Sequence, residues 1–176
     1  MTATTRLHPR GFTLLELMMV VTIVGLLSSV ALPLLNRATL RTRTAERYNI
    51  LHAIEIALQD AYVRGIVPPG GFLIGVPNPT VGVPGTQTRP FNPAAAGWPD
   101  IGVLVEGWIY YTYEYQAFES NGAVPAQYWI LATGDLDGDG IQTFKQIGAI
   151  RSSGSWVEQP PWPADGAEDV VTFGSF

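Results

Sequence analysis

Cysteine is absent from this sequence of 176 residues, and histidine occurs only twice, at His8 and His52. Without cysteine there is no disulfide framework, no thiolate metal site and no cysteine nucleophile. The chain also lacks a Gly-x-Ser-x-Gly elbow and a phosphate-binding loop. The sequence therefore contains no motif for serine-based acyl transfer or for nucleotide chemistry. The remaining enzymatic option is hydrolysis by paired carboxylates, which would use Glu106 or Glu114 with the acidic segment at residues 134–140. On these grounds we do not expect an enzyme.

Charge is almost missing from residues 11–35, where Glu16 is the one charged side chain. As a helix, the 24 residues from Phe12 to Leu35 would extend about 36 Å, which is enough to cross a hydrocarbon core of about 30 Å. We therefore predict that residues 12–35 form a transmembrane helix. A carboxylate inside such a helix is costly and by default marks a functional site, so a partner for Glu16 must be found.

A short basic leader precedes the apolar run. Residues 1–10 include Arg6 and Arg10, and Gly11 is the only small residue between this leader and the apolar helix. A secretory signal peptide would place its apolar stretch before the cleavage site, whereas here the apolar stretch follows Gly11. The string Gly-Phe-Thr-Leu-Leu-Glu over residues 11–16 resembles the class III leader of type IV prepilins and type II secretion pseudopilins.

This resemblance implies a processing event and an orientation. A prepilin peptidase would remove the leader, residues 1–11, by cutting after Gly11, and would methylate the new amine of Phe12, leaving 176 less 11, or 165, residues. Arginines flank the apolar run on both sides, so the positive-inside rule is ambiguous. The resemblance places the leader in the cytoplasm and the rest outside the inner membrane of a bacterium. It also implies that Gly25 and Pro33 loosen or kink the helix.

The resemblance gives Glu16 a partner as well. Cleavage would create an ammonium group at Phe12, about one helical turn from the carboxylate of the same subunit. In a filament, the Phe12 amine of one subunit can pair with Glu16 of its neighbour, which neutralises both charges at one axial stagger. The implied function is a structural subunit of a type IV pilus or a type II secretion pseudopilus. Its partners would be membrane lipid before assembly, the inner-membrane assembly machinery, copies of itself and related pilins.

The two ends of the chain differ in charge. Residues 1–47 hold six arginines and two glutamates, a balance of +4, whereas residues 48–176 hold three arginines and one lysine against thirteen acidic residues, a balance of −9. The membrane end is therefore basic and the exterior domain acidic. An acidic domain would repel a phosphate backbone, so no nucleic-acid partner is indicated.

The chain beyond the membrane divides into three segments. Helical spacing of apolar residues continues over residues 36–64, on a stripe that includes Leu51 and Leu58, and Gly65 followed by two prolines marks the end of the helix. Residues 65–100 hold eight prolines and seven glycines, which predicts a connecting loop without a helix. We expect residues 101–176 to form an antiparallel sheet domain.

Alternating and aromatic residues predict about four strands in this domain, with one more short strand at most, residues 72–76, in the loop. The four predicted strands are residues 108–118, 128–133, 142–150 and 170–173. The second is nearly all apolar and should be central. Tyr111, Tyr113 and Tyr115 share one face of the first strand, either for cross-strand packing or as an adhesive surface. The expected fold is α+β and pilin-like, with a long N-terminal helix packed on a small antiparallel sheet.

An acidic turn separates the second and third predicted strands. Asp135, Asp137 and Asp139 alternate with other residues and are followed by glycine, as in the first half of a calcium loop, and the carbonyl of Ile141 falls at the backbone-ligand position. The twelfth position departs from that pattern, because Gln146 stands where a bidentate glutamate belongs. The alternative is a hairpin turn with Asx-type hydrogen bonds. Two arguments favour calcium. The three carboxylates repel one another unless a cation lies between them, and an exported domain without cysteine would gain a stabilising cross-link from a bound ion.

A second functional hypothesis follows from the acidic turn. The chain would then be a single-span membrane-anchored protein whose calcium-dependent exterior domain binds a ligand without polymerising. Methylated Phe12 at the start of the mature chain supports the filament subunit, whereas an intact Met1 supports the anchored binder.

Overall fold

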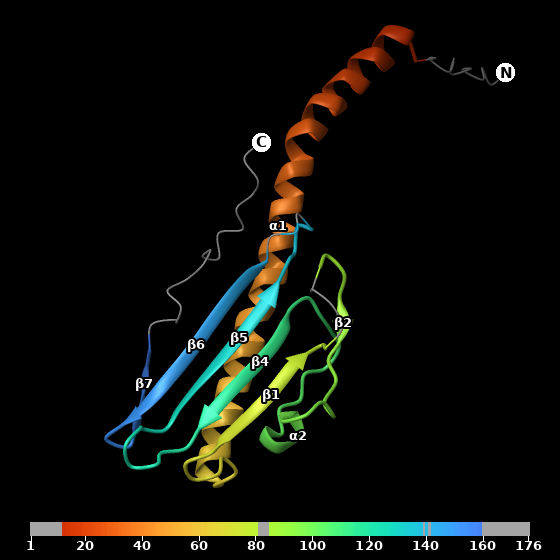
Figure 1. Ribbon diagram of the computed structural model, residues 1–176. Helices are drawn as coiled ribbons and strands as arrows, with labels where there is room; N and C mark the ends of the chain where they lie inside the picture. Colours follow the sequence, from red (N-terminus) through yellow and green to blue (C-terminus); the bar gives the residue numbers. More distant parts are fainter. Residues whose placement is uncertain (1–11, 81–84, 139, 141, 160–176) are drawn as a thin grey trace, which may run out of the picture. The chain divides into compact units, whose positions relative to one another are not determined.

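The computed structural model describes residues 12–80, 85–138, 140 and 142–159 (Figure 1). The chain divides into two compact units, residues 1–39 and residues 40–176. One long helix, α1 (Leu14–Val63), begins in the first unit and ends in the second. The apolar segment and the sheet domain therefore belong to different units.

The described part of the first unit is dominated by the apolar portion of α1. By length and composition α1 is suited to cross a membrane, and none of its most apolar stretch is buried within the chain. The helix continues without a break through Gly25 and Pro33. The expected loosening of the helix at these two residues stays a prediction.

The described part of the second unit holds the end of α1, the strands and one short helix. These elements are β1 (Phe72–Asn78), β2 (Arg89–Pro90), α2 (Trp98–Ile101), β3 (Trp108–Ile109), β4 (Thr112–Phe118), β5 (Gln127–Gly134), β6 (Thr143–Ser152) and β7 (Ser155–Glu158). Five strands form an antiparallel sheet in the order β1-β4-β5-β6-β7, and β2 pairs with β3 in a small second sheet. The predicted α+β fold is confirmed, and the apolar strand β5 is central.

The predicted strands differ from the observed ones mainly at their ends. Residues 128–133 and 142–150 correspond to β5 and β6, and residues 72–76 correspond to β1. The predicted strand 108–118 is divided, because β3 pairs with β2 whereas β4 pairs with β1 and β5. The predicted strand 170–173 lies outside the described residues.

Two short elements depart from the expectations. Helix α2 starts inside the segment 65–100, where no helix was expected, with Pro99 in its first turn, a place where proline is tolerated. Strand β7 was not predicted, and it forms one edge of the five-stranded sheet. It joins β6 through a turn at Ser153 and Gly154, whose φ angles are 51° and 84°. Positive φ at both central residues is typical of a type I′ hairpin turn.

The core lies between the sheet and the part of α1 that belongs to the second unit. The apolar stripe of the helix is buried there, as its spacing predicts: Leu51, Ile54, Leu58 and Ala61. The tyrosine row enters the same core, with Tyr111, Tyr113 and Tyr115 at most 1% exposed. Cross-strand packing is therefore the correct interpretation of this row, and the adhesive surface is wrong because the rings are not accessible.

The C-terminal end of α1 also follows the prediction. Gly65 has a φ of 69°, and its N–H donates to the carbonyl oxygen of Tyr62 at 3.1 Å. The N–H of Ile66 donates to the carbonyl oxygen of Ala61 at 2.9 Å. This pair of bonds is the Schellman motif, in which a left-handed glycine satisfies the last helical carbonyls.

Candidate functional site

The start of α1 is closed by Thr13 and Glu16. The backbone N–H and the hydroxyl of Thr13 both donate to Oε2 of Glu16 at 2.9 Å, and the N–H of Glu16 donates to Oγ1 of Thr13 at 3.3 Å. This reciprocal arrangement is a capping box, which satisfies backbone donors that the first helical turn leaves unpaired. A negative charge in this position also interacts favourably with the helix dipole.

The capping box places the Glu16 carboxylate at the head of an apolar surface. Both bonds from Thr13 go to Oε2, so neither uses Oε1. The neighbouring side chains Phe12, Leu14 and Leu15 are 75%, 79% and 72% exposed. The carboxylate is thus oriented by the chain itself and surrounded by apolar groups that the described part of the chain does not cover.

Sequence reasoning selected Glu16 but missed its local partner. The signal was available, because threonine followed three residues later by glutamate, ahead of an apolar run, is the sequence signature of a capping box. Phe12 is described and exposed, whereas Gly11 lies outside the described residues. The processing site predicted between Gly11 and Phe12 therefore stays a prediction.

Hydroxyl groups in the apolar portion of α1 bond to the helix itself. Thr22 Oγ1 donates to the Met18 carbonyl at 2.8 Å, and Ser29 Oγ donates to the Leu26 carbonyl at 2.7 Å. Such bonds let polar side chains enter a hydrocarbon environment at low cost. At Gly25, an added Cβ would meet no atom within 4 Å, so packing inside the chain does not require glycine there.

The acidic turn is organised by Asp135, which is buried. Its Oδ1 accepts the N–H of Gly138 at 2.8 Å, and its Oδ2 accepts the N–H of Gly140 at 3.1 Å. Both glycines have positive φ, 76° and 85°, a conformation that favours glycine. Asp135 therefore holds the loop by side-chain to backbone bonds of the kind expected for an Asx-type turn.

The calcium ligands predicted in this turn are only partly described. Asp137 is exposed, and Asp139 and Ile141 lie outside the described residues. Within the described ranges, no group of three or more histidine, aspartate or glutamate side chains gathers in a way that could hold a metal ion. The calcium site stays a prediction.

A basic and aromatic cluster that sequence reasoning missed lies where α1 meets the start of β4. Arg47 precedes the apolar stripe at residues 51–61 and is a charged residue, but it is only 1% exposed. Its guanidinium carbon lies 5.1 Å from the ring centre of Tyr111 and 5.2 Å from that of Tyr48. An arginine over aromatic faces gains cation–π attraction, so Arg47 is part of the packing in this region.

Two neighbours of Arg47 on the helix extend this cluster to Tyr110. The guanidinium carbon of Arg43 lies 4.7 Å from the ring centre of Tyr110, and Oε1 of Glu46 accepts the Tyr110 N–H at 3.3 Å. Burial raises the pKa of Glu46, and the bond from Tyr110 opposes that shift. The cluster joins the helix to the sheet through side chains that local sequence patterns do not connect.

Comparison with known proteins gives one family match, near the N-terminus, and several relatives. A family model described as a prokaryotic N-terminal methylation motif matches residues 6–32. No solved structure matches the chain significantly.

The relatives are pilins and fimbrial proteins. A type IV major pilin protein PilE1 of Neisseria gonorrhoeae is 34% identical over 80 residues, which are 46% of this chain and 37% of the relative. A fimbrial protein of Pseudomonas aeruginosa is 38% identical over 56 residues, 32% of this chain and 36% of the relative. Fimbrial protein EcpC of Eikenella corrodens is 32% identical over 68 residues, which are 38% of this chain and 44% of the relative. The chain spans less than half the length of these relatives.

A long apolar N-terminal helix and an antiparallel sheet covered by its second half define the pilin-like class of α+β proteins. The methylation motif and the relatives confirm the resemblance indicated by the first residues: the chain is similar to type IV pilins.

Proposed function

We propose that this subunit is cut after Gly11 by a prepilin peptidase and polymerises through its N-terminal helix into a type IV pilus or a type II secretion pseudopilus. The observation that carries the proposal is the contrast along α1. The stripe at residues 51–61 is buried against the sheet, whereas the side chains of residues 14–35 are exposed. An apolar surface of this extent is unfavourable in water and indicates an interaction surface. Lipid would cover them before assembly and neighbouring helices afterwards.

The position of Glu16 supports pairing between subunits. Removal of residues 1–11 would leave an ammonium at Phe12, next to the capping box of the same helix. The two hydrogen bonds from Thr13 orient the Glu16 carboxylate through Oε2. Neither bond uses Oε1, so this oxygen can accept a bond from a neighbouring subunit. A charge inside an apolar bundle is strongly destabilising when its partner is missing. Pairing Glu16 with the Phe12 amine of a neighbour would therefore select one axial stagger.

The same proposal assigns a location. The leader would face the cytoplasm, residues 12–35 would cross the inner membrane, and the acidic sheet domain would face outward before it becomes the surface of a filament. Its partners would be copies of the chain, related pilins and the inner-membrane assembly machinery. The methylation motif and the fimbrial relatives support this location.

A pair of substitutions at the capping box tests polymerisation. Glu16→Gln removes the charge but keeps an amide oxygen that can accept the Thr13 bonds. Thr13→Ala keeps the charge and weakens the cap, at a typical cost of about 1 kcal/mol. We expect both variants to insert and to be cleaved, but only Thr13→Ala to form filaments in electron micrographs of the cells. Filaments of Glu16→Gln as abundant as those of the unsubstituted chain would refute the pairing and favour the anchored binder.

Processing has its own test. Gly11→Leu should leave the full-length precursor in the membrane, because the peptidase requires the small residue before Phe12. Gly25→Ala is the matched control, since an added Cβ there meets no atom within 4 Å. Mass spectrometry should find the precursor in the first variant and a methylated chain starting at Phe12 in the second. A chain starting at Phe12 in Gly11→Leu contradicts the assigned site.

A further inference from the structure

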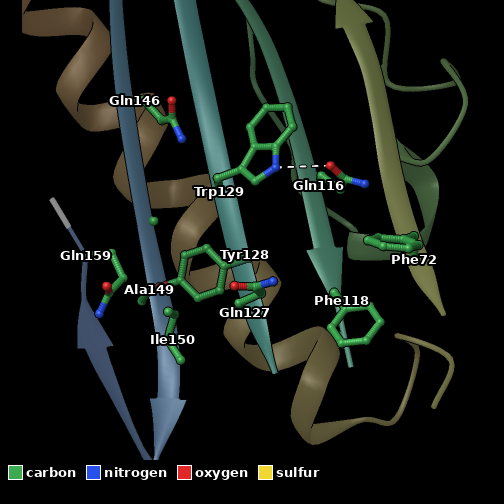
Figure 2. A pocket seen from close by; sticks show the side chains of 11 residues that line it. Phe72, Gln116, Phe118, Gln127, Tyr128, Trp129, Gln146, Ala149, Ile150 and Gln159 are labelled. Carbon is green, nitrogen blue, oxygen red and sulfur yellow. Dashed lines mark hydrogen bonds between the residues drawn. The ribbon is translucent and has the colours of Figure 1, made fainter. Parts of the chain in front are cut away.

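The face of the main sheet that points away from α1 carries a hollow of about 410 Å³ (Figure 2). It lies over β4, β5 and β6, with Trp129 of the central strand β5 among its lining residues. Side chains alternate along β5, so Tyr128 and Ile130 enter the core whereas Trp129 points outward. This surface is therefore separate from the helix-packing face and from the acidic turn.

A glycine explains why the hollow exists. Gly148 of β6 is the register partner of Trp129 on β5. A Cβ at Gly148 would lie 2.7 Å from the carbonyl oxygen of Tyr128, so no side chain fits there. One side of the indole is consequently left uncovered between Gln146 and Ile150. Glycine inside a strand marks, among other things, a place where another backbone approaches closely, and here that backbone is Tyr128 of β5.

The aromatic groups around the hollow are held in place before any ligand binds. The indole N–H of Trp129 donates to Oε1 of Gln116 at 3.1 Å, which fixes the ring relative to β4 (Figure 2). Phe72 and Phe118 form a neighbouring pair with ring centres 5.0 Å apart, and Phe72 is 57% exposed. Ordered aromatic faces bind with little loss of side-chain entropy.

Most of the polar side chains around the hollow are glutamines. Four glutamines line the hollow: Gln116, Gln127, Gln146 and Gln159. Each amide offers donors and an acceptor. Among the described residues that line it, none is charged. The site can therefore exchange hydrogen bonds in both directions but cannot neutralise an ion.

From this chemistry we propose that the hollow binds a neutral carbohydrate chain. Sugar rings have apolar C–H faces that pack on aromatic side chains, and hydroxyl groups that both donate to and accept from amides, which is the combination found here. A phosphate or carboxylate ligand lacks a cationic partner in the lining, and a lipid tail would offer no hydrogen-bond partner to the glutamine amides. A peptide strand cannot add to β4, β5 or β6 beneath the hollow, because these three strands are paired on both sides.

The test uses the full-length chain in a detergent without a sugar headgroup. The probes are maltohexaose, cellohexaose, N-acetylchitohexaose and lacto-N-neotetraose, with hexagalacturonate as the anionic comparison. Binding is followed by saturation-transfer difference NMR, which reports on weak ligands through their own protons. We expect at least one neutral probe to bind and hexagalacturonate to bind at least tenfold more weakly.

Three substitutions locate the binding. Trp129→Ala should abolish the signal, and Gln146→Ala should weaken binding several-fold even if the tryptophan variant folds poorly. Ile74→Ala is the matched control, because Ile74 is exposed on β1 but does not line the hollow. The proposal is overturned if no neutral probe binds, if hexagalacturonate binds as well as the neutral probes, or if Gln146→Ala and Ile74→Ala bind equally.

Discussion

The hydroxyl oxygen of Tyr62 lies 2.6 Å from the carbonyl oxygen of Gln127, at the point where the last turn of α1 meets the central strand. The same oxygen accepts the N–H of Phe118 at 3.0 Å. Phe118 and Gln127 are opposite each other in the β4–β5 ladder. The Tyr62 hydroxyl therefore links the last turn of α1 to the end of the β4–β5 ladder. Burial raises the pKa of this hydroxyl, so it stays protonated and can donate.

The first prediction is that Tyr62→Phe lowers the free energy of unfolding by about 1–3 kcal/mol, because the substitution leaves buried backbone groups of Phe118 and Gln127 without that partner. Thermal unfolding of the full chain measures the loss. Tyr48→Phe is the control, since Tyr48 is on the same helix but 47% exposed. Equal melting midpoints for the two variants would mean that the hydroxyl contributes nothing at this ladder end.

The second prediction concerns Gly75, which faces Tyr115 across β1 and β4. An added Cβ would lie 2.1 Å from Cε1 of Tyr115, and that ring is held by a bond from its hydroxyl to the Gly97 carbonyl and by an edge contact with Trp98. We expect Gly75→Ala to cost about 1–3 kcal/mol of unfolding free energy by overpacking.

A double-mutant cycle isolates this contact. In a Tyr115→Ala background the added methyl group should cost much less, giving a clear coupling between the two positions. Gly85→Ala is the control, because its Cβ would meet no atom within 4 Å. Strict additivity of Gly75→Ala and Tyr115→Ala would show that the ring is not what excludes a side chain at residue 75.

The third prediction is a dependence of stability on pH. Burial raises the pKa of Glu114 above its ordinary value of 4.5, so the folded chain binds this proton more tightly than the unfolded chain. Stability contributed by the protonated form is present below about pH 4.5 and is lost as the pH rises through the higher folded pKa. Glu114→Gln should therefore raise the melting midpoint at pH 7 and change it little at pH 4.

Glu106→Gln is the matched control for Glu114→Gln. It removes the same charge from an exposed position, so any general effect of lower net charge appears in both variants. A rise at pH 7 that is equal in the two variants, or one that persists unchanged at pH 4, would contradict a burial effect at Glu114.

The fourth prediction is that calcium stabilises the acidic turn. A ligand that binds only the folded state at a hundredfold excess over its Kd adds about 2.7 kcal/mol of stability. The melting midpoint should rise with calcium and fall with a chelator, and Asp137→Ala should abolish the shift while Asp100→Ala, outside the turn, retains it. An unchanged midpoint would leave Asp135 as a cap of the loop through Gly138 and Gly140 alone.

Patterns within a few residues were enough to predict much of this protein. Local patterns predict four features: the apolar run with Glu16, the end of the helix at Gly65, the buried tyrosine face and the central strand β5. Each pattern involves only residues that are close together in the sequence. The capping box of Thr13 and Glu16 and the Ser153–Gly154 turn were equally local, and their sequence signals were present although they were not recognised.

Which distant segments meet depends on tertiary packing that local patterns do not encode. The division between β3 and β4 depends on their different strand partners. Arg47 is buried because Tyr111, just before β4, packs against its guanidinium group, whereas a helical pattern alone predicts that an arginine is exposed to solvent. The hollow over Trp129 arises because Gly148 is its register partner, and strand register is set by pairing between residues far apart in the sequence.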